Sequence, residues 1–530
     1  MKKSLSFFLV FCLLLPSISL FAACGDPTGP GGGGGGAGVD VEFIDHLDDY
    51  GDSMDFSAQE EFIISYRDMY EYEVYGAEDS NEKIDTLIHN RNRLMEARFG
   101  VEISRKGKVQ SKSAIDFWAH HDYVQPLLNS GDVPFDALAM YASTAGRLIL
   151  GNGGNFLDWR SEIPYCKDSI KKGEEWWPVE PNISCTVMGK QYIAISDFAI
   201  TSVEMAYAVI FNKELARSEN VVYNYDRNTY NIDSTLYDMV RANDWTLDAM
   251  KTIISGFYRN NPASVSGKDE SDRYGLVATG GTDADAWCYA FGFTTMNNDG
   301  VNTPELWNWD GSQYDAIVAL RELYDAPDTW SVIKGGVSDD YNDRALFFSQ
   351  KDHVLFELNI LESLKLDVMH NMEQEYGVLP FPKYNKNQPR YYSSAIGHYT
   401  TLAIPFTTAW DAERLRMSGA LLEALSAENC NSVKKPYYDE IVTHHNVVDG
   451  DSVEMINIIM DGRLYDLGVY HMNSLQLEDL DTPTDTGLAV FFRHLLKHRS
   501  KDIIQYWTSN KGSLELQLDQ LLNDYANIGQ

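Results

Sequence analysis

The sequence predicts an α/β fold in two sections, followed by a largely helical end. Two observations indicate this class. Strand, helix and strand follow one another between residues 61 and 103, and the order recurs along the chain, as in a largely parallel sheet with helices on its faces. From residue 412 onward the apolar residues are spaced as in helices. About 470 residues follow a Gly-rich N-terminal stretch that ends near residue 57. They are too many for one hydrophobic core, so we expect two or three domains.

The first section opens with a short apolar strand at 61–66. A helix then begins with Ser80 as its N-cap and ends at Gly100, and its apolar residues from Ile84 to Phe99 recur on one face. The further elements predicted for this section are a strand at 101–103, a helix at 115–128, and strands at 135–140, 191–195 and 206–211.

The second section starts at Asn243. Thr246 is placed to cap a helix that runs to about residue 258. Asp248 lies in the first turn of this helix, where its negative charge interacts favourably with the helix dipole. The elements predicted after it are a strand at 274–279, helices at 283–291 and 314–324, strands at 353–357, 376–381, 391–396 and 400–406, and helices at 412–425, 453–460, 488–496 and 514–525.

The N-terminus is typical of a secretory leader. Lys2 and Lys3 precede an apolar run from about residue 5 to residue 21, and two alanines stand before Cys24. A spanning helix is the weaker interpretation, because Pro16 interrupts the run and a span needs about 20 uninterrupted apolar residues. The stretch 20–24 (LFAAC) resembles the bacterial lipobox, which implies a diacylglyceryl group on the Cys24 thiol and cleavage before it. We therefore expect residues 1–23 to be a lipoprotein signal peptide.

Residues 24–57 are predicted to be a flexible tether. An unbroken glycine run from Gly31 to Gly36 is followed by an acidic stretch from Asp40 to about Asp55, and such a composition cannot bury a core. Two acyl chains hold a protein on a membrane where one chain binds only marginally. We therefore expect the mature chain to lie at the cell surface, anchored by lipid to the outer face of the cytoplasmic membrane.

The composition limits the partners. The formal net charge is −35, and it becomes more negative once Lys2 and Lys3 leave with the leader. Nucleic acid is therefore not an expected partner, since binding to phosphate backbones depends mainly on clustered Lys and Arg. The remaining cysteines are interpreted as mostly buried apolar residues, with their pairing left open; they are Cys166, Cys185, Cys288 and Cys430.

Four segments carry a resemblance to a known family. They are residues 90–92 leading to 99–101 (NRN and FGV), residues 209–215 (VIFNKEL), residues 243–248 (NDWTLD) and residues 376–382 (YGVLPFP). With these segments in this order, the chain from about Glu61 to the C-terminus resembles family 1 extracellular solute-binding proteins, the receptors of ABC importers. Each segment is a signature of the scaffold, and none is catalytic.

The resemblance implies a two-lobed periplasmic-binding-protein-like fold of type II, with a ligand cleft between the lobes and a helical C-terminal part. Lobe 1 would comprise residues 58–203 plus 399–434, and lobe 2 residues 204–398 plus 435–530. Crossovers would lie near 199–207 and 397–405, with a return near 434–437, and hinge closure around the ligand would create the surface that a permease reads. The loop at 158–187 and the helical end are longer than in the maltose receptor of that family, so the identity of the substrate is not carried over.

A neutral sugar has apolar C–H faces and a rim of hydroxyls, so its receptor needs aromatic rings together with carboxylates or amides. Residues 281–289 (GTDADAWCY) combine both types at the start of a helix. By resemblance to the sugar-contacting element of the maltose receptor, Asp283, Asp285 and Trp287 are the first candidates for ligand binding. The alternative is that Trp287 is a core residue and that the aspartates cap the helix.

Other candidates stand near predicted strand ends and crossovers. Tyr141 follows the strand at 135–140, at a carboxyl end where open α/β sheets place ligands, although chance exposure explains it equally well. Arg67 either contacts a ligand or pairs with a neighbouring acid. Of Trp176 and Trp177 only one is expected to be available, since neighbours on a strand face opposite ways. The remaining candidates are Tyr70 after the first strand, Glu204 on the first crossover as hinge or ligand contact, Glu357 at a strand end, and Tyr465 after the turn at 461–463.

The sequence has none of the spacings that mark a serine hydrolase elbow, a zinc protease helix, a phosphate-binding loop or a calcium loop. The histidine pairs at 120–121 and 444–445 lack the spacing of metal ligands. We therefore expect no enzyme activity, no metal and no cofactor.

The predicted function is a lipid-anchored, monomeric solute receptor of an ABC importer. It would bind a small solute, with a sugar or oligosaccharide as the first expectation, and deliver it to the membrane permease. The alternative is a surface polysaccharide-degrading enzyme of the glycoside hydrolase type, since that chemistry needs only two carboxylates at a suitable separation. A third hypothesis is a receptor that serves a membrane sensor instead of an importer.

Overall fold

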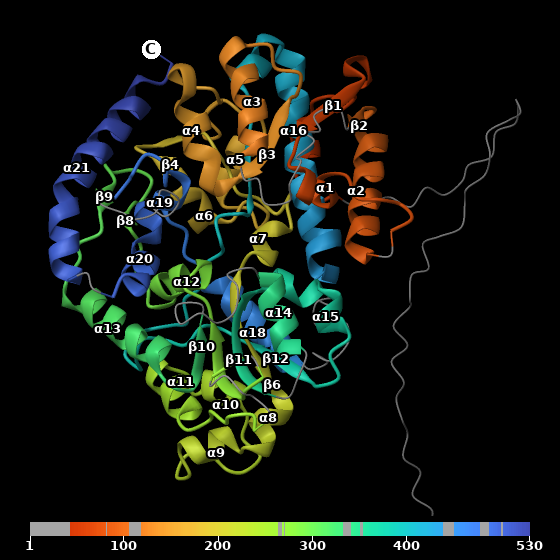
Figure 1. The fold of residues 1–530 in the computed structure, drawn as a ribbon. Helices are drawn as coiled ribbons and strands as arrows, with labels where there is room; N and C mark the ends of the chain where they lie inside the picture. The colour runs from red at the N-terminus through yellow and green to blue at the C-terminus, as the bar shows by residue number, and fades with distance from the viewer. Residues whose placement is uncertain are drawn as a thin grey trace, which may run out of the picture. The chain divides into compact units, whose positions relative to one another are not determined.

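Two separate β-sheets organise the chain (Figure 1). The first sheet consists of β1 (Glu61–Ser65), β2 (Glu102–Ser104), β3 (Ala137–Tyr141) and β13 (Thr400–Ala403), in the order β13-β3-β1-β2. β1 runs parallel to β2 and β3, whereas β13 is antiparallel to β3. The strand, helix and strand order predicted from residue 61 is thereby confirmed.

The second sheet has five strands in the order β10-β7-β11-β6-β12. β7 is parallel to β10 and β11, whereas β6 is antiparallel to both of its neighbours, β11 and β12. Almost every residue of these strands is buried, which fits a sheet covered by helices on both faces. The strands are β6 (Tyr207–Asn212), β7 (Tyr274–Ala278), β10 (Thr329–Ser331), β11 (Val354–Ile360) and β12 (Tyr376–Leu379).

The computed structural model describes residues 43–80, 82–104, 118–262, 268–269, 271–331, 341–349, 353–437, 450–477, 487–499 and 502–529. The predicted signal peptide, the lipidation residue Cys24, most of the predicted tether and the first residues of the helix predicted at 115–128 lie outside these ranges. Among the described residues, no helix is long and apolar enough to cross a membrane.

The helices around the first sheet begin and end largely as the sequence predicts. α2 (Lys83–Phe99) stops at Gly100, whose φ of 72° is the left-handed conformation common at helix ends. Its N-cap position is Glu82, not Ser80; the Ser80 hydroxyl donates to Asp85 at 2.6 Å and accepts the backbone N–H of Glu82 at 3.1 Å. The other helices of this part are α1 (Glu71–Val74), α3 (Ala119–Ser130), α4 (Ala145–Leu150), α5 (Cys166–Lys172), α6 (Val179–Ser184), α7 (Thr201–Glu204) and α16 (Ala412–Glu428).

Around the second sheet, Thr246 caps α11 (Leu247–Ile254) as predicted, and its hydroxyl accepts the backbone N–H of Ala249 at 3.2 Å. The helix ends before residue 258, earlier than predicted. The other helices here are α8 (Lys213–Ser218), α9 (Val221–Tyr225), α10 (Leu236–Arg241), α12 (Thr282–Ala290), α13 (Gly311–Asp325), α14 (Tyr341–Ser349), α15 (Asp367–His370) and α18 (Gly450–Asp461).

The C-terminal part is helical, with α19 (Leu467–Tyr470), α20 (Phe491–Lys497) and the 25-residue α21 (Ile503–Asn527). Near the start of α21, Trp507 packs on Trp309 with ring centroids 5.2 Å apart. Near its end, the Tyr525 ring lies 5.9 Å from that of Tyr192, a residue that precedes the second sheet in the chain. α21 therefore has contacts at both ends with different parts of the fold.

Two predicted strands are wrong. Residues 391–396 form only isolated bridges, from Ser393 to Arg463 and from Ala395 to Ala206, because this stretch passes between the sheets. The strand predicted at 191–195 reduces to β5 (Lys190–Gln191), paired with β4 (Thr186–Val187), and an isolated bridge at Ala194. A further small ribbon pairs β8 (Met296–Asn297) with β9 (Glu305–Leu306).

The four cysteines after Cys24 are buried, as predicted. Cys166, Cys185, Cys288 and Cys430 form no disulfide.

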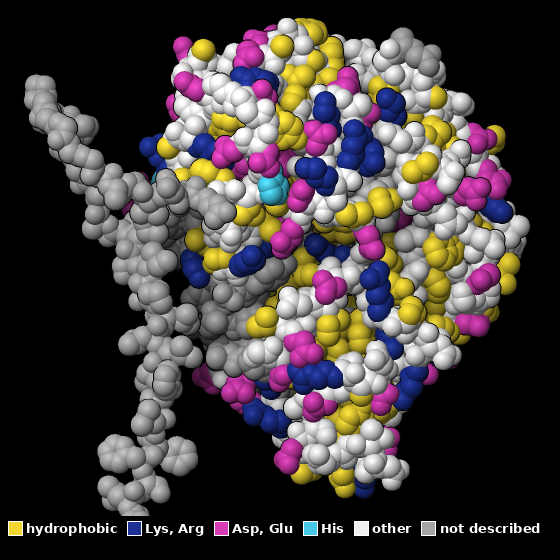
Figure 2. Space-filling view, turned by 180° about the vertical axis from the view of Figure 1, so that it is seen from behind, with side chains coloured by type: hydrophobic (Ala, Val, Ile, Leu, Met, Phe, Trp, Pro, Cys, Tyr) yellow, Lys and Arg dark blue, Asp and Glu magenta, His cyan; other side chains and the backbone are white. Residues whose placement is uncertain are grey.

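Seen from behind, the surface is hollowed near its middle, and charged side chains of both signs lie close together there (Figure 2).

Candidate functional site

Arg67, Tyr70 and Tyr141 come together where β1 and β3 end. The guanidinium carbon of Arg67 lies 4.3 Å from the ring centroid of Tyr70 and 3.9 Å from that of Tyr141. The two rings meet edge to face, with centroids 5.9 Å apart. The carboxyl ends of parallel strands are where open α/β sheets bind ligands, so three of the predicted residues share a favourable position.

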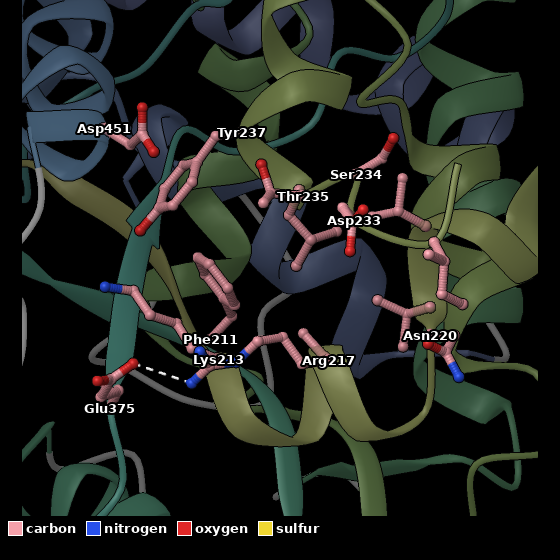
Figure 3. A pocket seen from close by; sticks show the side chains of 15 residues that line it. Phe211, Lys213, Arg217, Asn220, Asp233, Ser234, Thr235, Tyr237, Glu375 and Asp451 are labelled. Atoms are coloured by element: carbon pink, nitrogen blue, oxygen red, sulfur yellow. Dashed lines mark hydrogen bonds and ion pairs between the residues drawn. The ribbon is translucent and has the colours of Figure 1, made fainter. Parts of the chain in front are cut away.

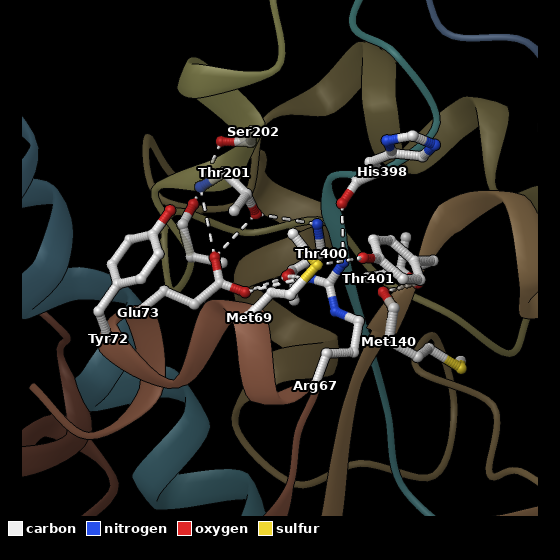
Figure 4. A network of polar contacts seen from close by, with 12 residues as sticks. Arg67, Met69, Tyr72, Glu73, Met140, Thr201, Ser202, His398, Thr400 and Thr401 are labelled. Atoms are coloured by element: carbon white, nitrogen blue, oxygen red, sulfur yellow. Dashed lines mark hydrogen bonds and ion pairs between the residues drawn. The ribbon is translucent and has the colours of Figure 1, made fainter. Parts of the chain in front are cut away.

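Arg67 is held in place by other groups of the protein (Figure 4). One guanidinium nitrogen donates to the carbonyl oxygen of His398 at 2.7 Å, and another donates to the carboxylate of Glu73 at 3.1 Å and to the hydroxyl of Thr400. The side chain is only 3% exposed. Arg67 therefore pairs with an acid, one of the two roles predicted for it, and it fixes the orientation of the two tyrosine rings.

Two further side chains border this cluster. The His398 ring lies 5.4 Å from the Tyr141 ring, and the hydroxyl of Tyr141 points to the sulfur of Met69 at 3.8 Å. Met69 is 40% exposed, whereas the two tyrosines are buried. The cluster thus presents a thioether and an imidazole beside the aromatic rings.

An ion pair from the second-sheet side lies near the same cluster. Asp285 on α12 and Arg493 on α20 are joined by a contact of 3.2 Å between the carboxylate and the guanidinium Nε. Burial, together with the positive charges of Arg67 and Arg493, lowers the pKa of His398 to about 3. The imidazole is therefore neutral at physiological pH, and Arg493 is close enough to influence it.

Glu362 adds a negative charge from the second-sheet side. It lies in the 3₁₀ segment Leu361–Lys365, which follows β11. Burial raises the pKa of Tyr70, and the charge of Glu362 raises it further. Glu362 also acts in this direction on the pKa of Tyr141, which burial raises most. We call Met69, Tyr70, Tyr141, Asp285, Glu362, His398 and Arg493 the inter-sheet site.

Trp287 and Asp283 lie inside the second-sheet part. Trp287 has no exposed surface, its indole N–H donates to the hydroxyl of Tyr324 at 3.2 Å, and its ring packs on Phe381 at 4.8 Å. Asp283 is also fully buried and accepts the backbone N–H of Thr279 at 2.6 Å, which closes the turn before α12. For both residues the geometry favours the structural alternative over ligand contact, whereas Asp285 on the same helix reaches the inter-sheet site.

Glu357 and Tyr465 also lie apart from the tyrosine cluster, whereas Glu204 borders it through Tyr72, whose ring lies 6.1 Å from that of Tyr70. Glu357 is not at a strand end, because β11 continues to Ile360, and it is fully buried. Burial raises its pKa to about 8, although the charge of Arg344 and a hydrogen bond from Asn359 oppose this. The Tyr465 ring packs edge to face on Tyr399 at 5.8 Å. Glu204 is fully buried on α7, where it accepts hydrogen bonds from three side chains of the protein.

Some site residues were missed by sequence reasoning. His398 stands on the second predicted crossover, so its position was a usable signal. Glu362 follows a predicted strand, as Tyr141 does, and the same rule of strand ends applies to it. Arg493 gave no signal, because its partner Asp285 is 208 positions away in the chain.

A cavity of about 630 Å³ lies elsewhere, around the end of β6 and the start of β12 (Figure 3). Its apolar lining includes Phe211, Val221 and Leu236, and two of its charged residues, Arg217 and Glu375, pair with each other at 2.9 Å. None of the residues predicted as ligand contacts lines it.

Comparison with known proteins gives matches by structure. No protein-family model and no curated protein sequence matches the chain. The galacto-N-biose/lacto-N-biose I-binding protein of an ABC transporter from Bifidobacterium longum, in complex with lacto-N-biose, is similar over 87% of this chain and 97% of its own, with 10% identity and a TM-score of 0.51. An ABC transporter associated binding protein from B. animalis subsp. lactis Bl-04, in complex with β-1,6-galactobiose, is similar over 87% and 98%, with 12% identity and a TM-score of 0.50.

The chain has the fold of the two-lobed solute-binding proteins. The predicted fold class is thus confirmed. We take each of the two larger sheets as the centre of one lobe. The predicted division of the chain into lobes stays a prediction. The inter-sheet site then takes its aromatic cluster from the first lobe and its ion pair from the second.

Proposed function

We propose that this chain is a carbohydrate receptor of an ABC importer and that it binds its solute between the lobes at the inter-sheet site. The observation that carries this proposal is that charges from the second-sheet side act on the cluster at the end of the first sheet: besides burial, Glu362 raises the pKa of Tyr70 and Tyr141, and Arg493 lowers that of His398. The fold supports it, since both similar structures named above are binding proteins in complex with disaccharides.

The chemistry of the inter-sheet site suits a neutral sugar. Tyr70 and Tyr141 keep their phenolic protons at neutral pH, because burial raises the pKa of both, so each hydroxyl donates and accepts hydrogen bonds. Asp285 accepts from sugar hydroxyls and Arg493 donates to them. The aromatic edges and Met69 offer apolar surface to the C–H faces of the sugar.

We also propose that the lipid on Cys24 anchors the receptor beside its permease at the cell surface. The leader, the lipobox-like stretch and the glycine run support this arrangement. A flexible tether keeps the receptor at a high local concentration near the membrane partner. The receptor would work as a monomer and without turning over its solute.

A panel of mono- and oligosaccharides tests the function. Each sugar is incubated with the mature protein, the melting temperature is measured, and the sugar is recovered and analysed by chromatography. A bound sugar should raise the melting temperature by mass action and be recovered intact. A panel without any stabilising sugar would contradict the proposal, and products that disappear when one carboxylate is replaced would identify a glycoside hydrolase instead.

A further inference from the structure

The chain segment that leads from the first lobe into the second is held by two buried carboxylates. This segment is α7 (Thr201–Glu204), which precedes β6. Glu73 binds its first residue, Thr201, and Glu204 is its last residue. The exposed fractions of the two acids are 1% and 0%. We call Glu73 and Glu204 the crossover carboxylates.

Glu73 ties both crossovers to the first lobe (Figure 4). Its carboxylate accepts the hydroxyl of Thr201 at 2.7 Å and the backbone N–H of the same residue at 3.3 Å. It also accepts the hydroxyl of Thr400, the first residue of β13. The backbone N–H of Thr400 in turn donates to the Thr201 hydroxyl at 3.0 Å. One side chain therefore holds the two crossing segments together.

Glu204 connects elements of both lobes. Lys365, which follows β11 of the second sheet, donates to it at 2.6 Å, and Tyr437 at the predicted return between lobes donates at 2.7 Å. The third donor is the hydroxyl of Tyr72 on α1 of the first lobe. The Lys365 ammonium also lies 4.7 Å from the centroid of the Tyr72 ring. A single buried carboxylate is thus the common partner of both lobes.

The same short elements carry the inter-sheet site. Tyr70 and Tyr72 are two positions apart, and their ring centroids are separated by 6.1 Å. On the other side, the segment Leu361–Lys365 carries both Glu362 and Lys365. The contact between Lys365 and Glu204 therefore joins the elements that carry site residues on both sides.

We propose that the contact of Glu204 with Lys365 and Tyr72 is a latch that sets the angle between the lobes and so positions the inter-sheet site for its solute. The positioning role rests on the proposed function. Removing the ammonium leaves a buried carboxylate with hydroxyl donors alone, which disfavours the arrangement of the lobes that makes this contact. The apparent dissociation constant then rises in inverse proportion to the remaining fraction of the competent arrangement.

Lys365→Met tests the latch, because methionine keeps most of the side-chain volume and removes the charge. The matched control is Lys386→Met, since Lys386 forms an ion pair of the same length, 2.6 Å, with Asp244 within the second lobe. Small-angle X-ray scattering without solute should give a larger radius of gyration for Lys365→Met than for the control. Calorimetry with the sugar identified on the panel should give an affinity about tenfold weaker, within the usual range of coupling between sites.

Two further variants keep the test decisive. Glu204→Gln should act like Lys365→Met, whereas Lys365→Arg should restore the wild-type radius and affinity, and melting curves establish that each variant is folded. Unchanged scattering in both charge-removing variants would overturn the latch. A larger radius with unchanged affinity would overturn its role in positioning the site. If the wild-type protein binds no sugar, the proposed function fails, and scattering alone then decides on the latch.

Discussion

Replacing Glu423 by Gln should change how the stability of the protein depends on pH. Glu423 is fully buried on α16 and accepts the Ser169 hydroxyl at 2.6 Å and the indole N–H groups of Trp176 and Trp177 at 2.8 Å each. Burial raises its pKa from 4.5 to about 7, although these three hydrogen bonds oppose the rise.

The sign follows from proton binding. Between pH 4.5 and 7 the folded protein holds the Glu423 proton and the unfolded chain has lost it, so stability falls as pH rises through this window. The full change in pKa corresponds to about 3 kcal/mol. Glutamine does not titrate, but it leaves one buried donor without its acceptor, at a cost of about 1–3 kcal/mol. The free energy of unfolding of the variant should therefore be lower than that of wild type at pH 4.5. The gap between the two free energies should shrink by about 3 kcal/mol towards pH 8.

Urea unfolding followed by circular dichroism at pH 4.5, 6 and 8 measures this gap. Glu413→Gln is the control, because Glu413 lies on the same helix, is largely exposed and pairs with Arg416. Its gap to wild type should stay within about 0.5 kcal/mol at every pH. A gap for Glu423→Gln that is the same at pH 4.5 and pH 8 would refute the reasoning.

Other predictions concern the site and the anchor. Arg493→Met should weaken sugar binding by about 1.5–3 kcal/mol in calorimetry, because it removes the charged hydrogen bonds that Arg493 donates; unchanged affinity would exclude Arg493 from the site. Glu357→Gln should leave the affinity unchanged within about twofold, since the residue is inside the second sheet. Trp287→Ala should lower the free energy of unfolding by about 3–5 kcal/mol, as expected for a core indole, and a small loss in urea unfolding would contradict this. Cys24→Ser should abolish the incorporation of radiolabelled palmitate into the protein; incorporation at the wild-type level would contradict lipidation of Cys24.

Local signals predicted much of the fold. The stop at Gly100 and the cap at Thr246 depend on chemistry within one helical turn, and both are in the structure. Arg67, Tyr70 and Tyr141 are each candidates because they follow a predicted strand, where open α/β sheets place ligands; their clustering is seen only in the structure. The helix stop, the cap and these strand-end positions need no knowledge of distant contacts.

The failures depend on distant contacts. Trp176 and Trp177 were expected to face opposite ways as on a strand, but they lie in a turn before α6, and both indoles reach the carboxylate of Glu423. Asp285 forms an ion pair with Arg493 because α12 packs on α20. Partners separated by some 200 positions leave no periodicity in the sequence, so no spacing rule detects them.

The contacts of α21 at both of its ends affect how this protein can be engineered. Beyond Tyr525, the side chain of Ile528 fills the space beside Gly154, and the backbone N–H of Gly529 donates to the carbonyl of Gly153 at 3.3 Å. A truncation before Ile528, made to attach a purification tag or fluorescent reporter, would therefore remove packed contacts. An insertion in an exposed turn, for example near Val301, which is 75% exposed, is the safer place for a sensor module.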